Sequence, residues 1–442
     1  MKYRGIFPLL LFFIQPASAE VISKIIITGN RVNESVIRSR LAFKEGDTLN
    51  EAAIEKSKTT LYSLGLFKSL NITKASDSAA GETTVIVDAR DGWFILPWPM
   101  FGSRGGSRYA GGMVIEQNYF KSAERVFLFG NYSDNASLNM VSVMLPELTF
   151  GAILDKRSLT EYLYADGAYN SSVLSENDIE KIEQYGIVTD SHEKEVDYLR
   201  FNLGKPVTND LNLALSVLTG TVKYSNAAQL LQKDTGRVNA LQLQASFGKP
   251  ESRMDMLTGF GRIFGLGMAD LKDNLKPLTA SKTNYGLIAS IENSNKGFGS
   301  DFEYNKAAFS VNRSTIFRNR SQFSLLCKAG FGSGLPASQL FATDRREGLK
   351  GTYAREFRGD AITIANTSYK HSFSRNSTGQ LNGEIYAEFA AAHLNDARKE
   401  KQGAGVNLTY QFWRFPLPLG FGYTYSFDDE DWQATVGIGG MF

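Results

Sequence analysis

The sequence predicts a membrane all-β protein, in which a 16-stranded antiparallel transmembrane β-barrel follows one small α+β domain. Three observations lead to this prediction. From Trp93 to Phe442, segments of about ten residues alternate apolar with polar side chains, and turn-forming residues separate them. Residues 21–90 instead carry two helical patterns among three strand patterns. Beyond the first residues, no apolar stretch is long enough for a membrane helix.

The chain begins with the features of an export signal, which we predict to span residues 1–19. Lys2 and Arg4 form a basic region, Leu9–Ile14 is a short apolar run, and Ala17-Ser18-Ala19 fits a cleavage site. The apolar run is too short to cross a bilayer. The formal net charge of +2 gives no basis for a nucleic-acid partner, and a single cysteine excludes an intrachain disulfide.

Residues 20–91 are predicted to form the small domain, in the order strand, helix, helix, strand, strand. The strand pattern VISKIIITGN ends at the turn pair Gly29-Asn30. Asn33 and Asn50 precede the two helical patterns and are residue types that cap helices. The segments FKSLNITKAS and TTVIVDAR then alternate as strands do.

This domain resembles a polypeptide-transport-associated (POTRA) domain, because IIITGN precedes a capped helix and LYSLGLF precedes a β-hairpin pattern. The resemblance implies an open strand edge, to which an unfolded polypeptide can add through main-chain hydrogen bonds. The second strand of the domain is the implied edge. Its client-binding residues would be Phe67, Ser69, Asn71 and Thr73.

Residues 92–442 are predicted to form the barrel, and the last strands show the pattern most clearly. PLPLGFGYTYSF has one aromatic and aliphatic face opposite Gly, Thr and Ser, and DWQATVGIGGMF ends the chain on Phe442. Such strands can cross a bilayer at a tilt, with aromatic side chains near their ends. The polar stretches Ser171–Glu195 and Leu271–Thr283 are predicted to be long extracellular loops.

A further polar stretch, EGLKGTYAREFRGDAI (Glu347–Ile362), is crowded with charges between two strand patterns. Counting strands back from the end of the chain predicts that it connects the eleventh and twelfth strands. A solvated loop would explain the charges. However, the stretch also resembles the loop that enters the lumen in the BamA/TamA superfamily, with a Val/Leu-Arg-Gly-Phe/Tyr motif. The matching residues are Leu349, Lys350, Gly351, Thr352 and Tyr353, followed by Arg355, Arg358 and Asp360.

The sequence departs from this motif in having Lys for Arg and an added Thr before the aromatic residue. The family pairs its motif Arg with an acid on the thirteenth strand. Alternation puts Glu384, Tyr386 and Glu388 on the lumen side of the corresponding segment. We therefore predict an ion pair between Lys350 and Glu388, weaker than an Arg–Asp pair because Lys lacks a bidentate fork. Ser368 stands where the family often has a second acid.

The first and last barrel strands are predicted to pair weakly, and the resemblance implies that this seam can open. Pro cannot donate a hydrogen bond to a strand ladder, and the predicted first strand contains two prolines. The predicted last strand contains several glycines. The seam residues are Phe94, Pro97, Pro99, Trp432, Val436 and Phe442.

The resemblance to the BamA/TamA superfamily implies a protein of the bacterial outer membrane, with the POTRA domain in the periplasm. The implied function is to assist the insertion, assembly or translocation of polypeptides. The expected partners are unfolded outer-membrane or exported polypeptides, outer-membrane lipids and other envelope assembly proteins, with no nucleic acid.

Two alternatives remain open from the sequence. One is a two-partner-type secretion pore for a specific protein, and the other is a passive porin or surface-antigen barrel. We expect no cofactor, no metal site and no enzymatic activity, because His192, His371 and His393 belong to no recognisable catalytic motif.

Overall fold

The chain divides into two units, Met1–Gly92 and Trp93–Phe442, close to the predicted boundary between residues 91 and 92. The predicted signal peptide lies outside the residues that the structure describes. The computed structural model describes residues 21–62, 66–75, 82–92, 95–104, 107–121, 124–133, 136–145, 148–170, 182–208, 210–227, 233–248, 281–344, 347–351, 353–376, 378–395, 397–412 and 418–438.

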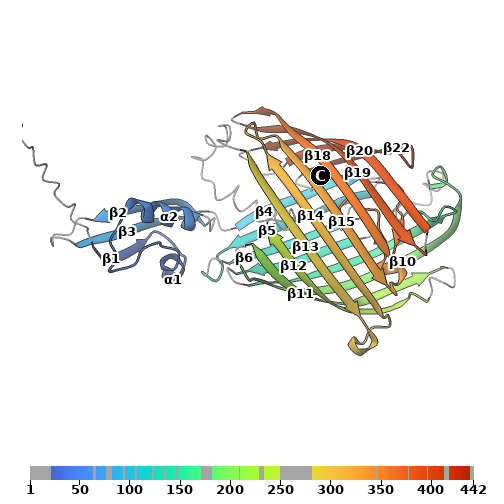
Figure 1. Cartoon of the computed structure of the whole chain (residues 1–442), viewed down its shortest axis with the longest axis horizontal. Coiled ribbons are helices and arrows are strands. Elements are labelled where there is room, and N and C mark those ends of the chain that lie inside the picture. Colours follow the sequence, from blue (N-terminus) through green and yellow to red (C-terminus); the bar gives the residue numbers. More distant parts are fainter. Residues whose placement is uncertain are drawn as a thin grey trace, which may run out of the picture. The chain divides into compact units, whose positions relative to one another are not determined.

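The first unit is a three-stranded sheet with two helices (Figure 1). Its elements are β1 (Val21–Thr28), α1 (Glu34–Arg38), α2 (Glu51–Tyr62), β2 (Phe67–Ala75) and β3 (Glu82–Asp91). The strand order is β1-β3-β2, in which β3 runs parallel to β1 and antiparallel to β2.

Apolar residues spaced for one helix face and one sheet face form the core of this unit. Ile37, Ile54 and Leu61 from the helices and Val85 and Val87 from β3 are all buried. Asn50 caps α2 as predicted, since its Oδ1 accepts a hydrogen bond from the Ala53 N–H at 2.8 Å. Asn33 occupies the N-cap position of α1 but makes no side-chain capping bond.

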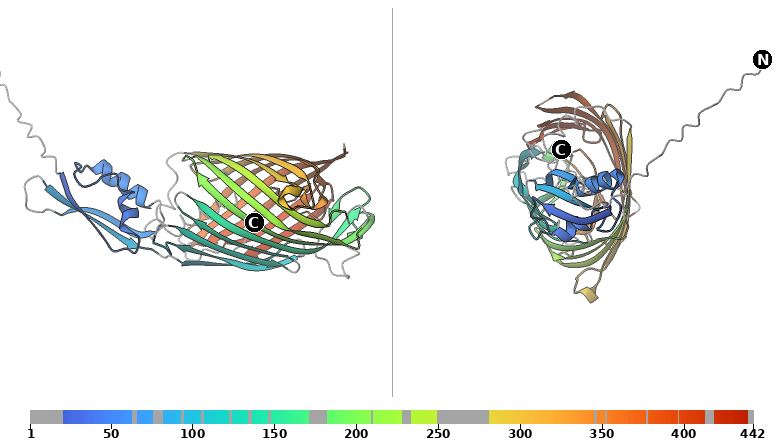
Figure 2. Two further views of the ribbon diagram at one scale, coloured as in Figure 1. Left: turned by 90° about the horizontal axis from the view of Figure 1, so that it is seen from below. Right: turned by 90° about the vertical axis from the view of Figure 1, so that its left-hand side faces the viewer.

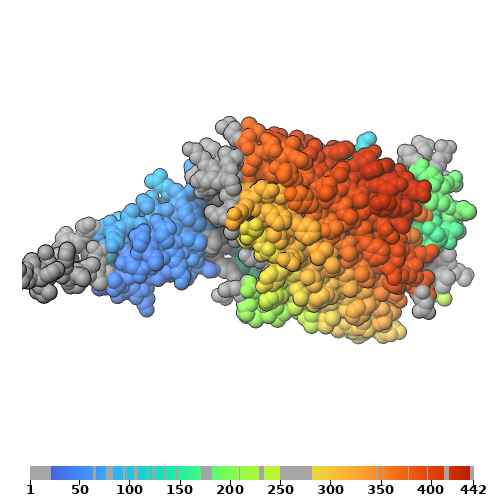
Figure 3. Space-filling view, turned by 45° about the horizontal axis from the view of Figure 1, so that its top comes forward, coloured from blue at the N-terminus to red at the C-terminus, as the bar shows by residue number. Residues whose placement is uncertain are grey.

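The second unit is a closed antiparallel barrel of 16 wall strands, which confirms the predicted fold class. Figure 1 shows its tilted strands, and Figure 3 shows one side of the outer surface that they form. Each wall strand pairs with its neighbours along the chain, and the last strand pairs with the first. The wall strands are β4 (Ile95–Arg104), β5 (Ser107–Gln117), β6 (Arg125–Ser133), β7 (Ala136–Met144), β8 (Thr149–Tyr164), β10 (Val188–Pro206), β11 (Leu211–Ser225), β12 (Gly236–Gly248), β13 (Lys282–Ser294), β14 (Tyr304–Ile316), β15 (Gln322–Ser333), β18 (Ala361–Arg375), β19 (Gly379–Leu394), β20 (Ala397–Phe412), β21 (Pro418–Ser426) and β22 (Asp431–Ile438).

Alternation along each strand separates two faces of the wall, whose strands run tilted (Figure 2). Outward side chains are apolar and exposed, for example Phe331 at 64% and Ile385 at 59%. Side chains at the lumen positions of the same region are polar and buried, for example Asn366 and Glu388. An apolar outer face with a polar interior is the pattern of a membrane barrel. Among the described residues, no helix is both long and apolar enough to span a membrane.

We call the end of the barrel at which β4 begins the near end, and the opposite end the far end. Antiparallel pairing puts the connection between β15 and β18 at the far end, and this connection lies between the eleventh and twelfth wall strands as predicted. The predicted loop Leu271–Thr283 lies mostly outside the described residues, which give only its flanking strands: β12 ends and β13 begins at the near end. By contrast, β8 ends and β10 begins at the far end, so the expectation that this loop and the one at Ser171–Glu195 share one end is wrong.

The predicted boundaries of the second of these loops also need correction. The strand β10 already begins at Val188, so residues 188–195 belong to the wall. Here the polar residues alternate: Glu193 and Glu195 are exposed, whereas His192 and Lys194 are buried. A strand that rises beyond the bilayer has two polar faces, and its sequence therefore looks like a loop.

Candidate functional site

The connection between β15 and β18, residues 334–360, folds into the barrel, and we call it the lumen loop. It contains the short elements η3 (Ala337–Gln339), β16 (Phe341–Ala342) and β17 (Arg358–Gly359). Its Lys350 contacts Ser368, which lies seven residues along β18 from the far end. At about 3.4 Å per residue, the loop reaches about 24 Å along the wall.

The ammonium group of Lys350 binds two groups of the lumen wall. Its Nζ donates to Ser368 Oγ on β18 at 2.7 Å and forms an ion pair with Glu384 on β19. Asn407 on β20 donates a further hydrogen bond to Glu384 at 3.1 Å. The lysine therefore joins the loop to three neighbouring strands through a charge-assisted network.

The predicted ion pair between Lys350 and Glu388 is wrong in its side-chain partner. Glu388 instead accepts hydrogen bonds from the main-chain N–H groups of Lys350 and Gly351, at 2.6 and 2.7 Å. It also accepts from the Tyr353 hydroxyl and, at 2.9 Å, from Asn366 Nδ2. The carboxylate therefore fixes the backbone of the loop, and its buried charge is offset by several donors.

Gly351 has to be glycine because the loop backbone lies against the wall. A Cβ atom there would lie 2.5 Å from Glu388 Oε1 and 2.6 Å from Thr424 Cγ2. No side chain fits at such distances. The glycine of the sequence motif is therefore explained by close approach between the loop and the Glu388 carboxylate.

The loop is also held by apolar packing, which the sequence argument did not expect. Leu349 is buried against Phe341, Ile362, Ile364 and Ala390. Leu349 and Phe341 belong to different parts of the loop. Ile362 and Ile364 line the lumen face of β18, and Ala390 lines that of β19. Burial of these side chains removes apolar surface from the lumen and stabilises the loop independently of its charges.

Two arginines of the loop bind carboxylates at the far end. Arg358 makes a bidentate pair with Glu161 on β8, at 3.0 and 2.9 Å, and both side chains are buried. Arg355 donates to Asp429 at 2.8 Å and to Asp166 at 3.0 Å. The loop thereby ties the turn after β8 to the turn between β21 and β22.

The sequence predicted Arg355 and Arg358 as site residues but indicated none of their partners. Glu161, Asp166 and Asp429 lie in strand ends and turns, where acidic residues are ordinary. Glu161 also contacts His192 and Lys194, at 3.3 and 3.2 Å. A buried cluster assembled from three distant segments leaves no local motif, so the sequence alone could not identify it.

The remaining predicted residues of this site have other roles. The Tyr386 hydroxyl lies 2.6 Å from Thr424 Oγ1 on β21 and so joins two parts of the wall. Asp360 accepts a main-chain hydrogen bond from the Gly332 N–H at 2.7 Å. Thr352 lies outside the described residues.

We predict that Arg358→Gln loosens the lumen loop at the far end. Breaking a buried pair by removing one partner costs about 3–5 kcal/mol, because the other charge stays buried. Hydrogen–deuterium exchange of residues 337–360 should therefore accelerate while the barrel remains folded. Arg398→Gln is the matched control, since Arg398 forms an exposed pair with Glu400 on β20. Equal exchange in the two variants would contradict the assignment.

The seam between β22 and β4 is the shortest pairing of the described wall. It has four residue pairs, from Thr435↔Arg104 to Ile438↔Phe101. The next shortest pairing, between β21 and β22, has eight pairs, from Leu419↔Ile438 to Ser426↔Asp431. These four pairs are the described part of the seam, and residues 439–442, which continue the chain beyond β22, lie outside it.

The seam residues are distributed unevenly along this junction. Val436 pairs with Ser103, whereas Pro97 and Pro99 lie beyond the described pairs and face β5 on their other side. Trp432 lies at the start of β22, where it contacts Tyr423 and Tyr425. Phe94 and Phe442 lie outside the described residues. Pro97 and Pro99 supply no N–H group to a ladder, which agrees with the sequence argument.

Of the two edge strands in the first unit, β1 is covered by its own chain. The Ile22 N–H donates to Asp47 O at 2.9 Å, and the Ile25 N–H donates to Glu45 Oε1 at 2.9 Å. The second bond is the main cause that holds the pKa of Glu45 below its ordinary value. The edge strand β2 is therefore the better candidate for strand addition, in agreement with the sequence.

The structure corrects which groups of β2 face outward. Leu70 donates its N–H to the Tyr62 hydroxyl at 3.1 Å, so this N–H points away from β3. Alternation gives Ile72 the same direction and turns the main-chain groups of Asn71 and Thr73 toward β3. Ser69 also belongs to the inward set, and the Phe67 side chain is buried. The named residues therefore mark the right strand but the wrong set of donors.

The fold and the site together define a β-barrel of the outer-membrane type with a POTRA domain. Residues 20–90 match the family model POTRA, described as a surface antigen variable number repeat. A comparison of the sequence with curated proteins gave no match. Residues 20–90 therefore form a POTRA domain.

Solved structures show the same fold over nearly the whole chain. The chain is similar to CdiB from Acinetobacter baumannii, with 11% identity and a TM-score of 0.62 over 95% of this chain and 74% of that one. It is also similar to BamA from Haemophilus ducreyi lacking POTRA domains 1–3, with 14% identity and a TM-score of 0.60 over 95% and 84%. CdiB from Escherichia coli gives 12% identity and a TM-score of 0.61 over 95% and 76%. The chain thus has the POTRA-plus-barrel fold of the solved CdiB and BamA structures, which is the fold that the resemblance in the sequence implied.

Proposed function

We propose that this protein assists the insertion, assembly or translocation of polypeptides at the bacterial outer membrane, without enzymatic chemistry. The POTRA domain would lie in the periplasm, and the far end of the barrel would face the outside. The observation that carries the proposal is the strand that closes the barrel, because β4 pairs with β22 and contains Pro97 and Pro99, which supply no N–H group to a ladder. A passive solute channel does not need such residues in its closing strand.

The proposed mechanism uses two open strand edges in turn. An unfolded polypeptide first adds to the outer edge of β2 through main-chain hydrogen bonds, which demand little of its sequence. Opening of the seam then exposes the edges of β4 and β22, which pair with strands of the client. The lumen loop holds β18–β21 and the far-end turns together, so that the rest of the wall stays closed while the seam opens.

A photocrosslinking amino acid placed on the exposed edge strands tests this function in cells. We expect Thr73 on β2 and Ser103 on β4 to capture the same outer-membrane polypeptides. Lys24 on β1 is the matched control, because it is exposed on the strand whose edge is covered. A passive porin would capture no client at any position. Capture at Lys24 equal to that at Thr73 would move the docking edge away from β2.

A further inference from the structure

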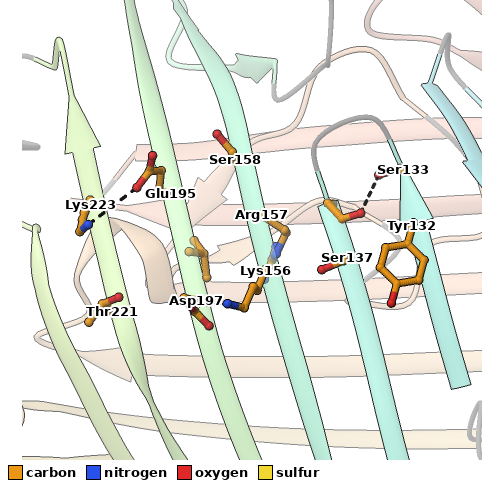
Figure 4. Close-up of a pocket in the computed structure, with 12 residues that line it drawn as sticks. Tyr132, Ser133, Ser137, Lys156, Arg157, Ser158, Glu195, Asp197, Thr221 and Lys223 are labelled. Carbon is orange, nitrogen blue, oxygen red and sulfur yellow. Dashed lines mark hydrogen bonds and ion pairs between the residues drawn. The ribbon is translucent and has the colours of Figure 1, made fainter. Parts of the chain in front are cut away.

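Two depressions adjoin on the outer wall of the barrel, on the strands that follow the seam. The first, which we call the polar hollow, measures about 500 Å³ (Figure 4). Its lining includes Tyr132, Ser137, Lys156, Glu195, Asp197 and Lys223. The second, which we call the apolar hollow, measures about 890 Å³, and its lining includes Gly112, Leu128, Gly130, Val141, Leu154 and Leu199.

The two hollows form one continuous strip along the same strands. Moving two residues along β8 leads from Leu154 in the apolar hollow to Lys156 in the polar hollow, and a step of two keeps the same face. The same step links Leu199 to Asp197 on β10, Gly130 to Tyr132 on β6 and Asn139 to Ser137 on β7. In each case the residue that lines the polar hollow lies nearer the far end. The strip therefore has a polar head and an apolar body, like a membrane lipid.

The polar hollow offers exposed charges in weak pairs. Lys156 on β8 lies 3.0 Å from Asp197 on β10, and Lys223 on β11 lies 3.9 Å from Glu195 on β10. All four side chains are at least half exposed, and such pairs contribute little stability. The ammonium groups can therefore exchange their partners for phosphate groups.

The spacing of these charges fits more than one phosphate. Lys156 and Lys223 lie on strands separated by β10, which places their main chains about 10 Å apart. The carboxylates of Glu195 and Asp197 lie between them and can hold a divalent cation, which in turn binds phosphate oxygens. Hydroxyl groups of Ser137, Ser158 and Thr221 line the same hollow as additional donors.

The apolar hollow is too broad for a single acyl chain. Its lining extends from Pro97 and Pro99 on β4 to Leu199 on β10, across six neighbouring strands and about 24 Å. Small residues, among them Gly112, Gly130 and Ala152, make the surface concave between larger side chains. Several acyl chains can lie side by side here, and some would cover the outer face of the seam strand β4.

We propose that the two hollows form one binding site for a glycolipid of the lipid A class, which carries two phosphates and more than two acyl chains. This inference rests on the proposed function for its orientation, because the far end must face the outer leaflet, which consists of such lipids. Lys156 and Lys223 bind the phosphates, and the acyl chains fill the apolar hollow beside the seam. A bound lipid then shields the outer face of β4 until a client strand displaces it.

Binding of purified full-length protein to hexa-acylated, bisphosphorylated lipid A tests the site by native mass spectrometry. Replacing both lysines, Lys156→Ala with Lys223→Ala, should weaken binding about 30-fold, at roughly fivefold per lysine. Ala152→Phe should also weaken binding, because it fills the apolar hollow. The matched control, Arg398→Ala, removes an exposed paired cation at the same end but on another part of the wall, and it should bind as the unmodified chain does.

A comparison of lipid A with two-chain phospholipids tests which class of lipid the site binds. Phosphatidylethanolamine and phosphatidylglycerol, with two chains each, should bind at least tenfold more weakly than lipid A, and EDTA should weaken lipid A binding. Equal binding of a two-chain phospholipid, or an equal loss in Arg398→Ala, would overturn the proposal. Heat-modifiable migration of each variant verifies folding. The test uses no client, so its failure leaves the crosslinking test of the proposed function unaffected.

Discussion

An oxidised disulfide between Ser103→Cys and Val436→Cys is expected to reduce client insertion to background while the barrel stays folded. These two residues are direct partners across the seam, and both point outward. A covalent bond at their position would hold β4 and β22 together and deny their edges to a client. Phe94 cannot serve in this test, because it lies outside the described residues and the partner of Val436 is Ser103. Cys327→Ser is needed in all variants, since Cys327 is exposed.

The control for this experiment is a second disulfide in a long junction of the wall. Leu243 and Ile291 are partners across β12 and β13, and both are exposed on the outer face. Their crosslink should leave function unchanged, which separates seam closure from a general effect of oxidation. Client insertion that persists with the seam verifiably crosslinked would rule out lateral opening, and it would favour passage of the client through the lumen.

Glu388→Ala is expected to damage the lumen loop more than Lys350→Ala does. Glu388 accepts hydrogen bonds from two main-chain N–H groups of the loop as well as from Tyr353 and Asn366. Each donor left unpaired in a buried position costs about 1–3 kcal/mol. Lys350→Ala removes one ammonium group, and Glu384 then keeps its hydrogen bond from Asn407. Protease cleavage within the loop and client insertion measure both effects.

Charge exchange separates the two carboxylates more sharply. Lys350→Glu with Glu384→Lys should restore part of the function lost in either single variant, because these side chains form an ion pair. Lys350→Glu with Glu388→Lys should not, since an ammonium group at position 388 would face the N–H donors of the loop. Better rescue by the second exchange would show that the loop takes a different path in the functioning protein.

Much of this architecture could be predicted because strand patterns are local. Alternation with period two separates the outer and lumen faces of segments such as Gly379–Leu394, and turn residues mark their ends. The same pattern located the lumen loop, because the strands after it could be counted. Residues 188–195, the far-end part of β10, look like a loop in the sequence because both faces of the strand are polar there. A strand with two polar faces loses the contrast on which the pattern depends.

The sequence by itself determined a small α+β domain, a 16-stranded barrel and the place of the charged loop between the eleventh and twelfth strands, because short-range alternation and capping specify these elements. The resemblance to known families implied that the small domain is a POTRA domain and that the loop enters the lumen. Only the tertiary structure decided which groups meet. Glu384 and Glu388 share one face of β19. The path of the loop backbone decides that Glu384 pairs with the ammonium group of Lys350 and that Glu388 accepts a hydrogen bond from the Lys350 main-chain N–H. Arg358 and Glu161 are 197 residues apart in the chain. Barrel closure brings them together, and no local pattern records a contact that depends on closing the whole wall.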